Sequence, residues 1–352
     1  MSNEPIDPFV GEKMVPQSHG QATKTDPFEG RWKTLGEWGR DWLEAPPAKR
    51  RWLLTRDGDG VLPLGKVAML AAAGGVGKTM ALTQLAFSVA TGNKWLGTFE
   101  VPEDATGRVL LALGEEDAEE VRRRVWNTLK MVNASERERE LLSSRLVIVP
   151  LAGTPSALIK AERGGEHSAT DALDFLRARL DGSGEPWRLI VLDPLSRFAG
   201  ADTEKDNAAA TRFVQAVEAL VEAPGGPTVL LAHHTNKADR AAGADSQGAS
   251  AARGVSGLTD GVRWVAELRN DKEVRGFVWL SAPTKSNYSR TDFGDVCLLR
   301  DGKRGGALRL PVAAELGEYE AKKAPDSTPA KRSPGKSLAP AMGAELDRSG
   351  LE

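Results

Sequence analysis

A lysine followed by a threonine closes a glycine-rich stretch, an arrangement typical of phosphate binding. Residues 72–79 read Ala-Ala-Gly-Gly-Val-Gly-Lys-Thr, which matches the phosphate-loop pattern G-x-x-x-x-G-K-[ST] except for alanine at its first position. Glycines let backbone N–H groups curl around an anion with no Cβ in the way. We expect Lys78 to neutralise the β- and γ-phosphates of a bound nucleotide and the Thr79 hydroxyl to bind Mg²⁺.

The residues around this loop supply the setting that the pattern requires. An apolar run at 67–71 precedes it, a helical pattern at 80–91 follows, and Gly92 ends the helix. The helix N-terminus would direct unpaired amides at the same phosphates. The alternative is a glycine-rich strand-to-helix turn that carries Lys-Thr by chance. The expected ATP-binding residues of this segment are Gly74, Gly75, Val76, Gly77, Lys78, Thr79 and Met80.

A second metal ligand is expected at Asp193, which ends the apolar run at 189–192. A carboxylate at the end of a buried strand can hold the water shell of the Mg²⁺ bound by Thr79. Alone, such an aspartate is more often a turn or cap residue. Downstream of a phosphate loop, the metal-binding interpretation is favoured, with Thr79 and Asp193 as the metal residues.

Hydrolysis also needs a base that orients water towards the γ-phosphate. Glu115 and Glu116 follow the apolar run at 108–113. Adjacent residues at a strand end point to opposite sides, so one of the two is expected to act, and we favour Glu116. The alternative role for this acidic run is to complement the dipole of the next helix.

A histidine pair, His233 and His234, follows another apolar run at 228–232. His234 or His233 could hydrogen-bond the γ-phosphate and report its loss to the loop that follows. We favour His234, and a buried structural histidine is the alternative. No third histidine or cysteine lies close enough in the sequence to indicate a zinc site.

The order of the apolar runs and helical patterns predicts the fold. Strands alternate with helices, which indicates an α/β protein with a mostly parallel sheet flanked by helices. Ligands of such sheets bind at the carboxyl ends of the strands, where Glu116, Asp193 and His234 are expected. A chain of 352 residues with 40% hydrophobic residues can form a substantial core.

Composition limits the remaining possibilities. The formal charge of −2 indicates no overall basic field for nucleic acid, and Cys297 as the single cysteine excludes an internal disulfide. The N-terminus lacks an apolar leader segment, and no run is long enough to cross a bilayer. These features predict a soluble, cytoplasmic protein without a membrane partner.

Four segments are expected along the chain. They are a disordered segment at 1–27, a tryptophan-rich helical arm at 28–50, the ATPase domain at 51–318 and a disordered tail at 319–352. The spacing of apolar residues predicts one amphipathic helix over 31–43. We expect its tryptophans to dock this helix on the protein core, and contact between subunits is the alternative. The apolar residues are Trp32, Leu35, Trp38, Trp42 and Leu43.

The chain resembles the RecA-like hexameric ATPases, and among them the RepA-type replication helicases of plasmids and their phage and mobile-element relatives. The resemblance covers about residues 51–301 and rests on several short stretches read together. These are residues 74–79, Glu116-Asp117, the run from Val191 to Phe198, His233-His234, Ala252-Arg253-Gly254, Val262-Arg263-Trp264 and Lys285-Ser286-Asn287-Tyr288.

This resemblance implies roles for two cations. Arg263 occupies the position where the family places an arginine finger that reaches the ATP of a neighbouring subunit. Lys285 occupies the position where RecA-like proteins have a second cation that acts across subunits. Arg253 is a weaker candidate for the arginine finger. The alternative interpretation of Arg263 and of Lys285 is a surface cation on a strand. The chain has histidine where many relatives have glutamine, and Asn287 replaces an expected cation.

The resemblance further implies a homo-oligomer, expected as a hexameric ring, that binds single-stranded DNA and works with replication partner proteins. The channel loops would carry the cations Arg197, Lys205, Lys237, Arg240 and Arg253. These loops contain few aromatic residues for base stacking. The expected function is an ATP-driven DNA helicase or translocase of plasmid or phage replication. The alternatives are an ATP-gated, recombinase-like DNA-binding protein and a regulatory ATPase that acts on proteins.

Overall fold

A computed structural model describes residues 29–163, 165–200, 203, 205–235 and 256–323. The chain divides into two compact units, Met1–Arg50 and Arg51–Glu352. The segments predicted to be disordered at 1–27 and beyond 323 lie outside the described residues, so their disorder stays a prediction.

The N-terminal unit contains two short helices, α1 (Leu35–Trp38) and α2 (Asp41–Glu44). The prediction of one continuous helix over 31–43 is wrong, because Gly39 adopts a φ of 111° and ends the first helix. Thr34 and Glu37 form a capping box at the start of α1. The rings of Trp38 and Trp42 lie 5.0 Å apart. The large apolar side chains of this unit are exposed, and their docking partner stays a prediction.

The second unit is built on a ten-stranded sheet with the order β14-β13-β11-β10-β3-β9-β8-β4-β5, and β12 pairs with β10. Strands β10, β3, β9, β8, β4 and β5 are parallel, whereas β11, β12, β13 and β14 are antiparallel additions. The predicted parallel α/β core is confirmed, and the antiparallel extension was not foreseen. The strands are β3 (Val67–Ala72), β4 (Arg108–Leu113), β5 (Leu146–Pro150), β8 (Trp187–Asp193), β9 (Thr228–His234), β10 (Trp264–Asn270), β11 (Phe277–Leu280), β12 (Lys285–Ser286), β13 (Val296–Asp301) and β14 (Ala307–Arg309).

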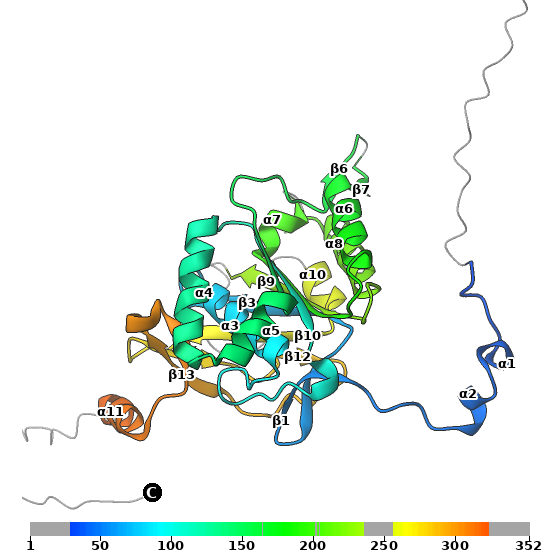
Figure 1. The fold of residues 1–352 in the computed structure, drawn as a ribbon. Helices are drawn as coiled ribbons and strands as arrows, with labels where there is room; N and C mark the ends of the chain where they lie inside the picture. The colour runs from blue at the N-terminus through cyan, green and yellow to red at the C-terminus, as the bar shows by residue number, and fades with distance from the viewer. Residues whose placement is uncertain (1–28, 164, 201–202, 204, 236–255, 324–352) are drawn as a thin grey trace, which may run out of the picture. The chain divides into compact units, whose positions relative to one another are not determined.

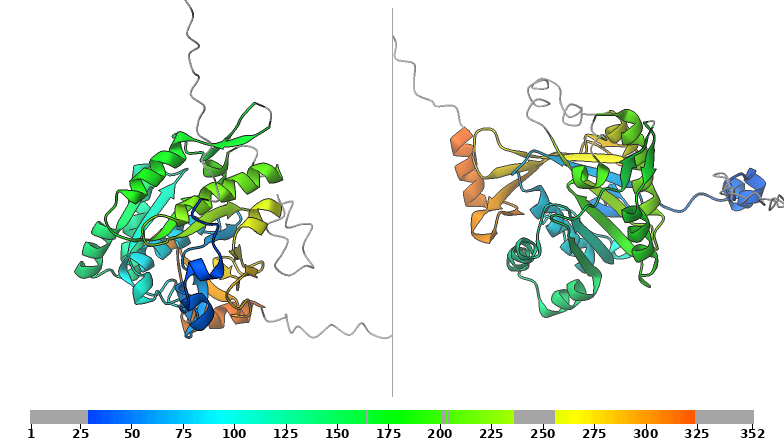
Figure 2. Two further views of the ribbon diagram at one scale, coloured as in Figure 1. Left: turned by 90° about the vertical axis from the view of Figure 1, so that its right-hand side faces the viewer. Right: turned by 90° about the horizontal axis from the view of Figure 1, so that it is seen from above.

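Helices cover both faces of this sheet (Figures 1 and 2). On one face lie α3 (Lys78–Thr91), α4 (Ala118–Val132) and α5 (Glu136–Arg145). On the other lie α6 (Asp171–Asp181), α7 (Leu195–Ala199), α8 (Asn207–Val221) and α10 (Ser256–Gly261). Strand β3 alternates between the two cores, because Ala68 and Leu70 pack with the α3 side while Val67 and Met69 pack with the α8 side. A strand buried on both faces must be apolar throughout.

Smaller elements complete the unit. They are the hairpin β1 (Trp52–Arg56) and β2 (Asp59–Pro63), the hairpin β6 (Ile159–Ala161) and β7 (His167–Ala169), the 3₁₀ turns η1 (Glu103–Ala105) and η2 (Gly302–Arg304), and helix α11 (Ala313–Lys323). The predicted domain boundary at 318 falls inside α11. Tyr319 explains why the helix continues, since its ring packs 4.6 Å from that of Phe277 and its hydroxyl donates to Asp271. Within the described residues, no helix combines the length and apolarity needed to cross a membrane.

Candidate nucleotide site

The glycine-rich loop lies between β3 and α3, as its pattern predicts. Strand β3 ends at Ala72 and α3 begins at Lys78. Gly75 and Gly77 have φ values of 75° and 109°, in the region that favours glycine, so two of the loop glycines are needed for backbone shape. Ala72 is still a strand residue, paired with His234 on β9 and with Leu268 on β10. The alanine that departs from the motif therefore precedes the turn itself.

Lys78 and Asp193 face each other at the base of the loop. Their Nζ and Oδ1 atoms lie 3.8 Å apart, and each side chain is only 4% exposed. Burial lowers the pKa of Lys78 and raises the pKa of Asp193, and the attraction between the two charges opposes both shifts. The structure therefore brings together the predicted phosphate-binding lysine and the predicted metal-site carboxylate.

Two buried atoms of this pair, Nζ of Lys78 and Oδ2 of Asp193, have no hydrogen-bond partner among the described residues. A buried charged atom without a partner is costly, and a ligand that supplies one removes that cost. Triphosphate oxygens fit the lysine, and a hydrated Mg²⁺ fits the carboxylate. Burial raises the pKa of Asp193 and the nearby Thr79 side chain opposes that rise, so the two predicted metal residues lie close together. In the described chain, no three His, Cys, Asp or Glu side chains form a metal cluster, so phosphate and water would complete the coordination.

Glu115 and Glu116 differ in their surroundings. Glu116 Oε1 accepts a hydrogen bond from Arg124 of α4 at 2.5 Å, which holds Glu116 against the helix that follows it. The charge of Glu115 instead raises the pKa of Lys78, and Glu115 Oε1 lies 3.3 Å from Nε of Arg197. The sequence favoured Glu116, whereas the electrostatic effect of Glu115 on Lys78 indicates that Glu115 lies near the phosphate loop.

Gly114 allows the end of β4 to approach the end of β8 closely. A Cβ on Gly114 would lie 2.7 Å from Cβ of Arg197, which is too close for any other residue. The Gly114 N–H also donates to the Asp193 carbonyl at 2.7 Å. The glycine thus holds the end of β4 against the end of β8, where the acidic groups must meet.

The histidine pair lies at the end of β9, the strand between β3 and β8. His234 pairs in register with Ala72, and its charge lowers the pKa of Asp193. His233 pairs with Ala71, one residue further from the loop. His234 therefore lies nearer the phosphate loop along the strand than His233, and its contact with the γ-phosphate stays a prediction.

Arg263 and Lys285 lie at the opposite edge of the sheet. Arg263 precedes β10, and its N–H donates to the carbonyl of Val67 at the start of β3. The five-residue length from there to Ala72 corresponds to roughly 16 Å of strand. Lys285 Nζ donates to the carbonyls of Thr259 and Asp260. Repulsion by Arg263 lowers the pKa of Lys285, after the larger effect of burial, so the two cations are neighbours.

One basic residue at the loop has no signal in the sequence pattern. Arg300 near the end of β13 donates from Nη2 to the Gly75 carbonyl at 2.6 Å. A Cβ on Gly77 would lie 3.2 Å from the same nitrogen. Arg300 stands more than 200 residues from the loop in sequence, in a strand whose pairing could not be foreseen. No local spacing could have identified it.

Of the predicted channel cations, Arg197 lies on α7 and Lys205 is exposed just before α8. Lys237, Arg240 and Arg253 lie outside the described residues.

Comparison with known proteins adds the family. A family model described as "AAA domain" matches residues 32–240, more than half of the chain, and includes the loop, Asp193 and His234. This chain belongs to the AAA domain family. The AAA domain is an ATPase, as its phosphate loop predicts. Arg263, Lys285 and Arg300 lie beyond the matched range.

Two solved structures are similar to this AAA domain protein. One is described as an ATPase domain, with 14% identity, a TM-score of 0.47, and coverage of 70% of this chain and 85% of that one. The other is described as "The Structure Of A DnaB-Like Replicative Helicase And Its Interactions With Primase", with 14% identity and a TM-score of 0.49. It covers 70% of this chain, which spans only 59% of that protein's length.

Proposed function

We propose that the protein is a ring-forming, ATP-driven helicase or translocase that acts on single-stranded DNA in plasmid or phage replication. The observation that carries the proposal is that two pairs of charged residues lie at opposite edges of the sheet. Lys78 and Asp193 lie at the carboxyl edge of the sheet, whereas Arg263 and Lys285 lie at the amino edge. Cations that cannot reach the phosphates of their own chain are suited to complete the site of a neighbour.

The chain's own residues would hold the substrate as follows. Backbone N–H groups of residues 74–79 surround the phosphates, Lys78 binds the β- and γ-phosphate oxygens, and Thr79 with Asp193 holds Mg²⁺. The metal supplies positive charge that offsets the charge on the phosphates. The burial of Lys78 and Asp193 strengthens these contacts because water does not screen them.

We assign the base to Glu115, because Arg124 binds the alternative Glu116. The Glu115 carboxylate would accept a proton from the attacking water. The water oxygen would then bond to the γ-phosphorus while the bond from the γ-phosphorus to the bridging β-phosphate oxygen breaks. His234 would hydrogen-bond the γ-phosphate and lose that contact on hydrolysis. The following segment carries the predicted DNA-binding cations, so the loss of the phosphate would be communicated to DNA.

Assembly enters through Arg263 and Lys285. A guanidinium and an ammonium from the adjacent subunit would stabilise charge on the transferring phosphoryl group. Hydrolysis would then require a closed ring, and a homo-hexamer is the assembly we propose. Arg197 and Lys205 from each copy would contribute to a cationic channel surface that follows the DNA backbone.

The test is the ATPase rate across protein concentrations, with and without single-stranded DNA, followed by strand displacement on a forked duplex. The proposal expects a rate per subunit that rises with concentration, stimulation by DNA and displacement that requires ATP. Stimulation without displacement would indicate a recombinase-like protein. A rate that DNA does not change would favour a regulatory ATPase and contradict the proposal.

A further inference from the structure

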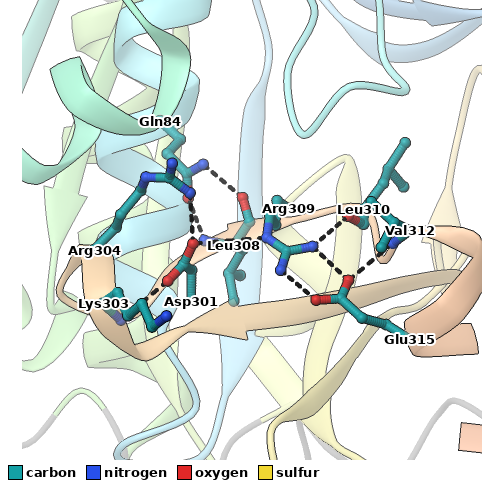
Figure 3. Close-up of polar contacts among 9 residues, drawn as sticks. All are labelled: Gln84, Asp301, Lys303, Arg304, Leu308, Arg309, Leu310, Val312 and Glu315. Atoms are coloured by element: carbon teal, nitrogen blue, oxygen red, sulfur yellow. Dashed lines mark hydrogen bonds and ion pairs between the residues drawn. The ribbon is translucent and has the colours of Figure 1, made fainter. Parts of the chain in front are cut away.

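The antiparallel hairpin formed by β13, η2 and β14 is attached to the phosphate-loop helix. Gln84 of α3 exchanges two hydrogen bonds with the backbone of Leu308, at 2.7 Å from its Nε2 and 2.9 Å to its Oε1 (Figure 3). Both residues are buried. The side chains of Asp301 and Arg304 brace the turn of the hairpin, with Arg304 Nη1 2.7 Å from the Asp301 carboxylate. The hairpin therefore has a defined position against the nucleotide site.

From this hairpin, Arg300 extends to the outside of the loop. Its Nη2 donates to the Gly75 carbonyl, and Gly77 lies beneath the guanidinium, where any Cβ would be 3.2 Å from Nη2. Among the described residues, no carboxylate forms an ion pair with Arg300. Burial alone lowers the pKa of this side chain. A guanidinium has five N–H donors and a planar face, and the Gly75 contact uses one donor.

The sheet order indicates which end of a nucleotide Arg300 would meet. Strands β8 and β9, which end at Asp193 and His234, and strand β4, which precedes Glu115, all lie on one side of β3. The γ-phosphate belongs on that side, because these groups act on it. Strand β13 lies on the other side of β3, beyond β10 and β11. It runs in the same direction as β10, since two antiparallel pairings separate them, so Arg300 lies at the edge of the sheet that carries the loop.

We propose that Arg300 forms a subsite for the nucleoside end of ATP, contributed in cis by the C-terminal hairpin. This inference depends on the nucleotide site of the proposed function. The planar guanidinium would stack on the adenine face, while its Nη2 keeps the loop carbonyl of Gly75 in place. Lys78 and the loop amides would hold the triphosphate independently of Arg300.

The test compares two probes by equilibrium binding with Mg²⁺ and without DNA, a non-hydrolysable ATP analogue and inorganic tripolyphosphate. Arg300→Ala is expected to weaken the analogue about tenfold, which is the size of one stacking contact. The affinity for tripolyphosphate, which has no nucleoside, is expected to stay within about twofold. Lys303→Ala is the matched control, because it removes an exposed cation from the same hairpin.

Other outcomes overturn the inference. Equal weakening of both probes would mean that Arg300 only shapes the phosphate loop, and no weakening of either would remove it from the site. Thermal unfolding of each variant checks the fold. If Arg300→Ala does not fold, Arg300→Lys takes its place, since it keeps the charge but lacks the planar face, and it must weaken the analogue selectively. Absence of DNA stimulation would overturn the proposed function without changing these binding results.

Discussion

Lys78 Nζ and Asp193 Oδ1 lie 3.8 Å apart, buried together and too distant for a good hydrogen bond. Each has an atom without a hydrogen-bond partner in the part of the chain that the structure describes. A purely structural ion pair would have a shorter distance between the charged atoms, because only close and well-aligned contact offsets the free-energy cost of burying two charges. The gap between the two side chains suits a pair that each binds part of a ligand.

Lys78→Ala is expected to reduce ATP hydrolysis at least about 100-fold, because it removes the buried cation that faces Asp193 at the base of the phosphate loop. The steady-state ATPase rate measures this. Lys94→Ala is the control, since Lys94 forms an exposed ion pair with Glu100 near the other end of α3. Near-normal turnover in Lys78→Ala would remove the central assignment.

Glu115→Gln and Glu116→Gln separate the two candidate bases. Loss of a general base costs about 10²- to 10⁴-fold in rate, and we expect this of Glu115→Gln with nucleotide binding retained. Glu116→Gln only weakens the contact with Arg124, so its turnover is expected to stay within a few-fold of wild type. The single-turnover hydrolysis rate decides between them. A larger loss in Glu116→Gln would support the assignment made from sequence.

Arg263→Ala is expected to bind ATP normally but to lose about 10³-fold or more of the hydrolysis rate in the assembled state. Arg212→Ala is the control, because Arg212 is an exposed residue of α8. Mixing Arg263→Ala with Lys78→Ala subunits tests the geometry, because an intact loop in one subunit can then meet an intact arginine in the next. Some activity should return in the mixture. If none returns, Arg263 acts within its own chain or has a structural role.

The contacts of Asp271 with α11 are expected to weaken in acid. Its side chain is 3% exposed and accepts hydrogen bonds from Trp279 and Tyr319, and Lys323 Nζ lies 3.1 Å away. Although burial acts in the opposite direction, hydrogen bonds from the backbone N–H groups of Val274 and Glu273 and from the Trp279 and Tyr319 side chains hold the pKa of Asp271 well below its ordinary value of 3.8. The unfolded chain therefore takes up the proton first as pH falls. The stability from Asp271 is complete above about pH 4 and is lost as pH falls further.

Asp271→Asn is expected to lower the free energy of unfolding by about 2–3 kcal/mol at pH 7, through the loss of charged hydrogen bonds. Below about pH 4 the difference from wild type should shrink. Urea unfolding at pH 7 and pH 3 measures both effects. Glu273→Gln is the control, because Glu273 is 65% exposed and 3.9 Å from Lys323. An equal difference at both pH values would contradict the titration.

Removal of residues 324–352 is expected to leave the ATPase rate unchanged, because their composition offers no core-forming pattern. Removal of residues 313–352 also deletes Tyr319, which packs against Phe277. We expect this longer truncation to lower the melting temperature. A large loss of activity on removal of 324–352 alone would show that the tail binds or packs.

The sequence by itself determined the parts of this protein whose physics is local. A loop that must curl around phosphate needs glycines in a fixed order, so residues 74–79 could be assigned without coordinates. The positions of Asp193 and His234 at the ends of β8 and β9 were predictable, because a strand buried on both faces is apolar until its last residues. Strand and helix alternation likewise predicted the parallel core.

Tertiary structure alone decided how neighbouring and remote side chains are partnered. Glu115 and Glu116 differ in their surroundings because Arg197 pairs with the first and Arg124 with the second, and the positions of both arginines follow from helix packing. Gly39 divides the arm by adopting a φ that no apolar spacing reveals. Arg300 meets Gly75 only because antiparallel strands extend the sheet past β10 and turn back towards α3. Such long-range pairings leave no periodic signal in the chain, because each depends on where the whole sheet places its edges.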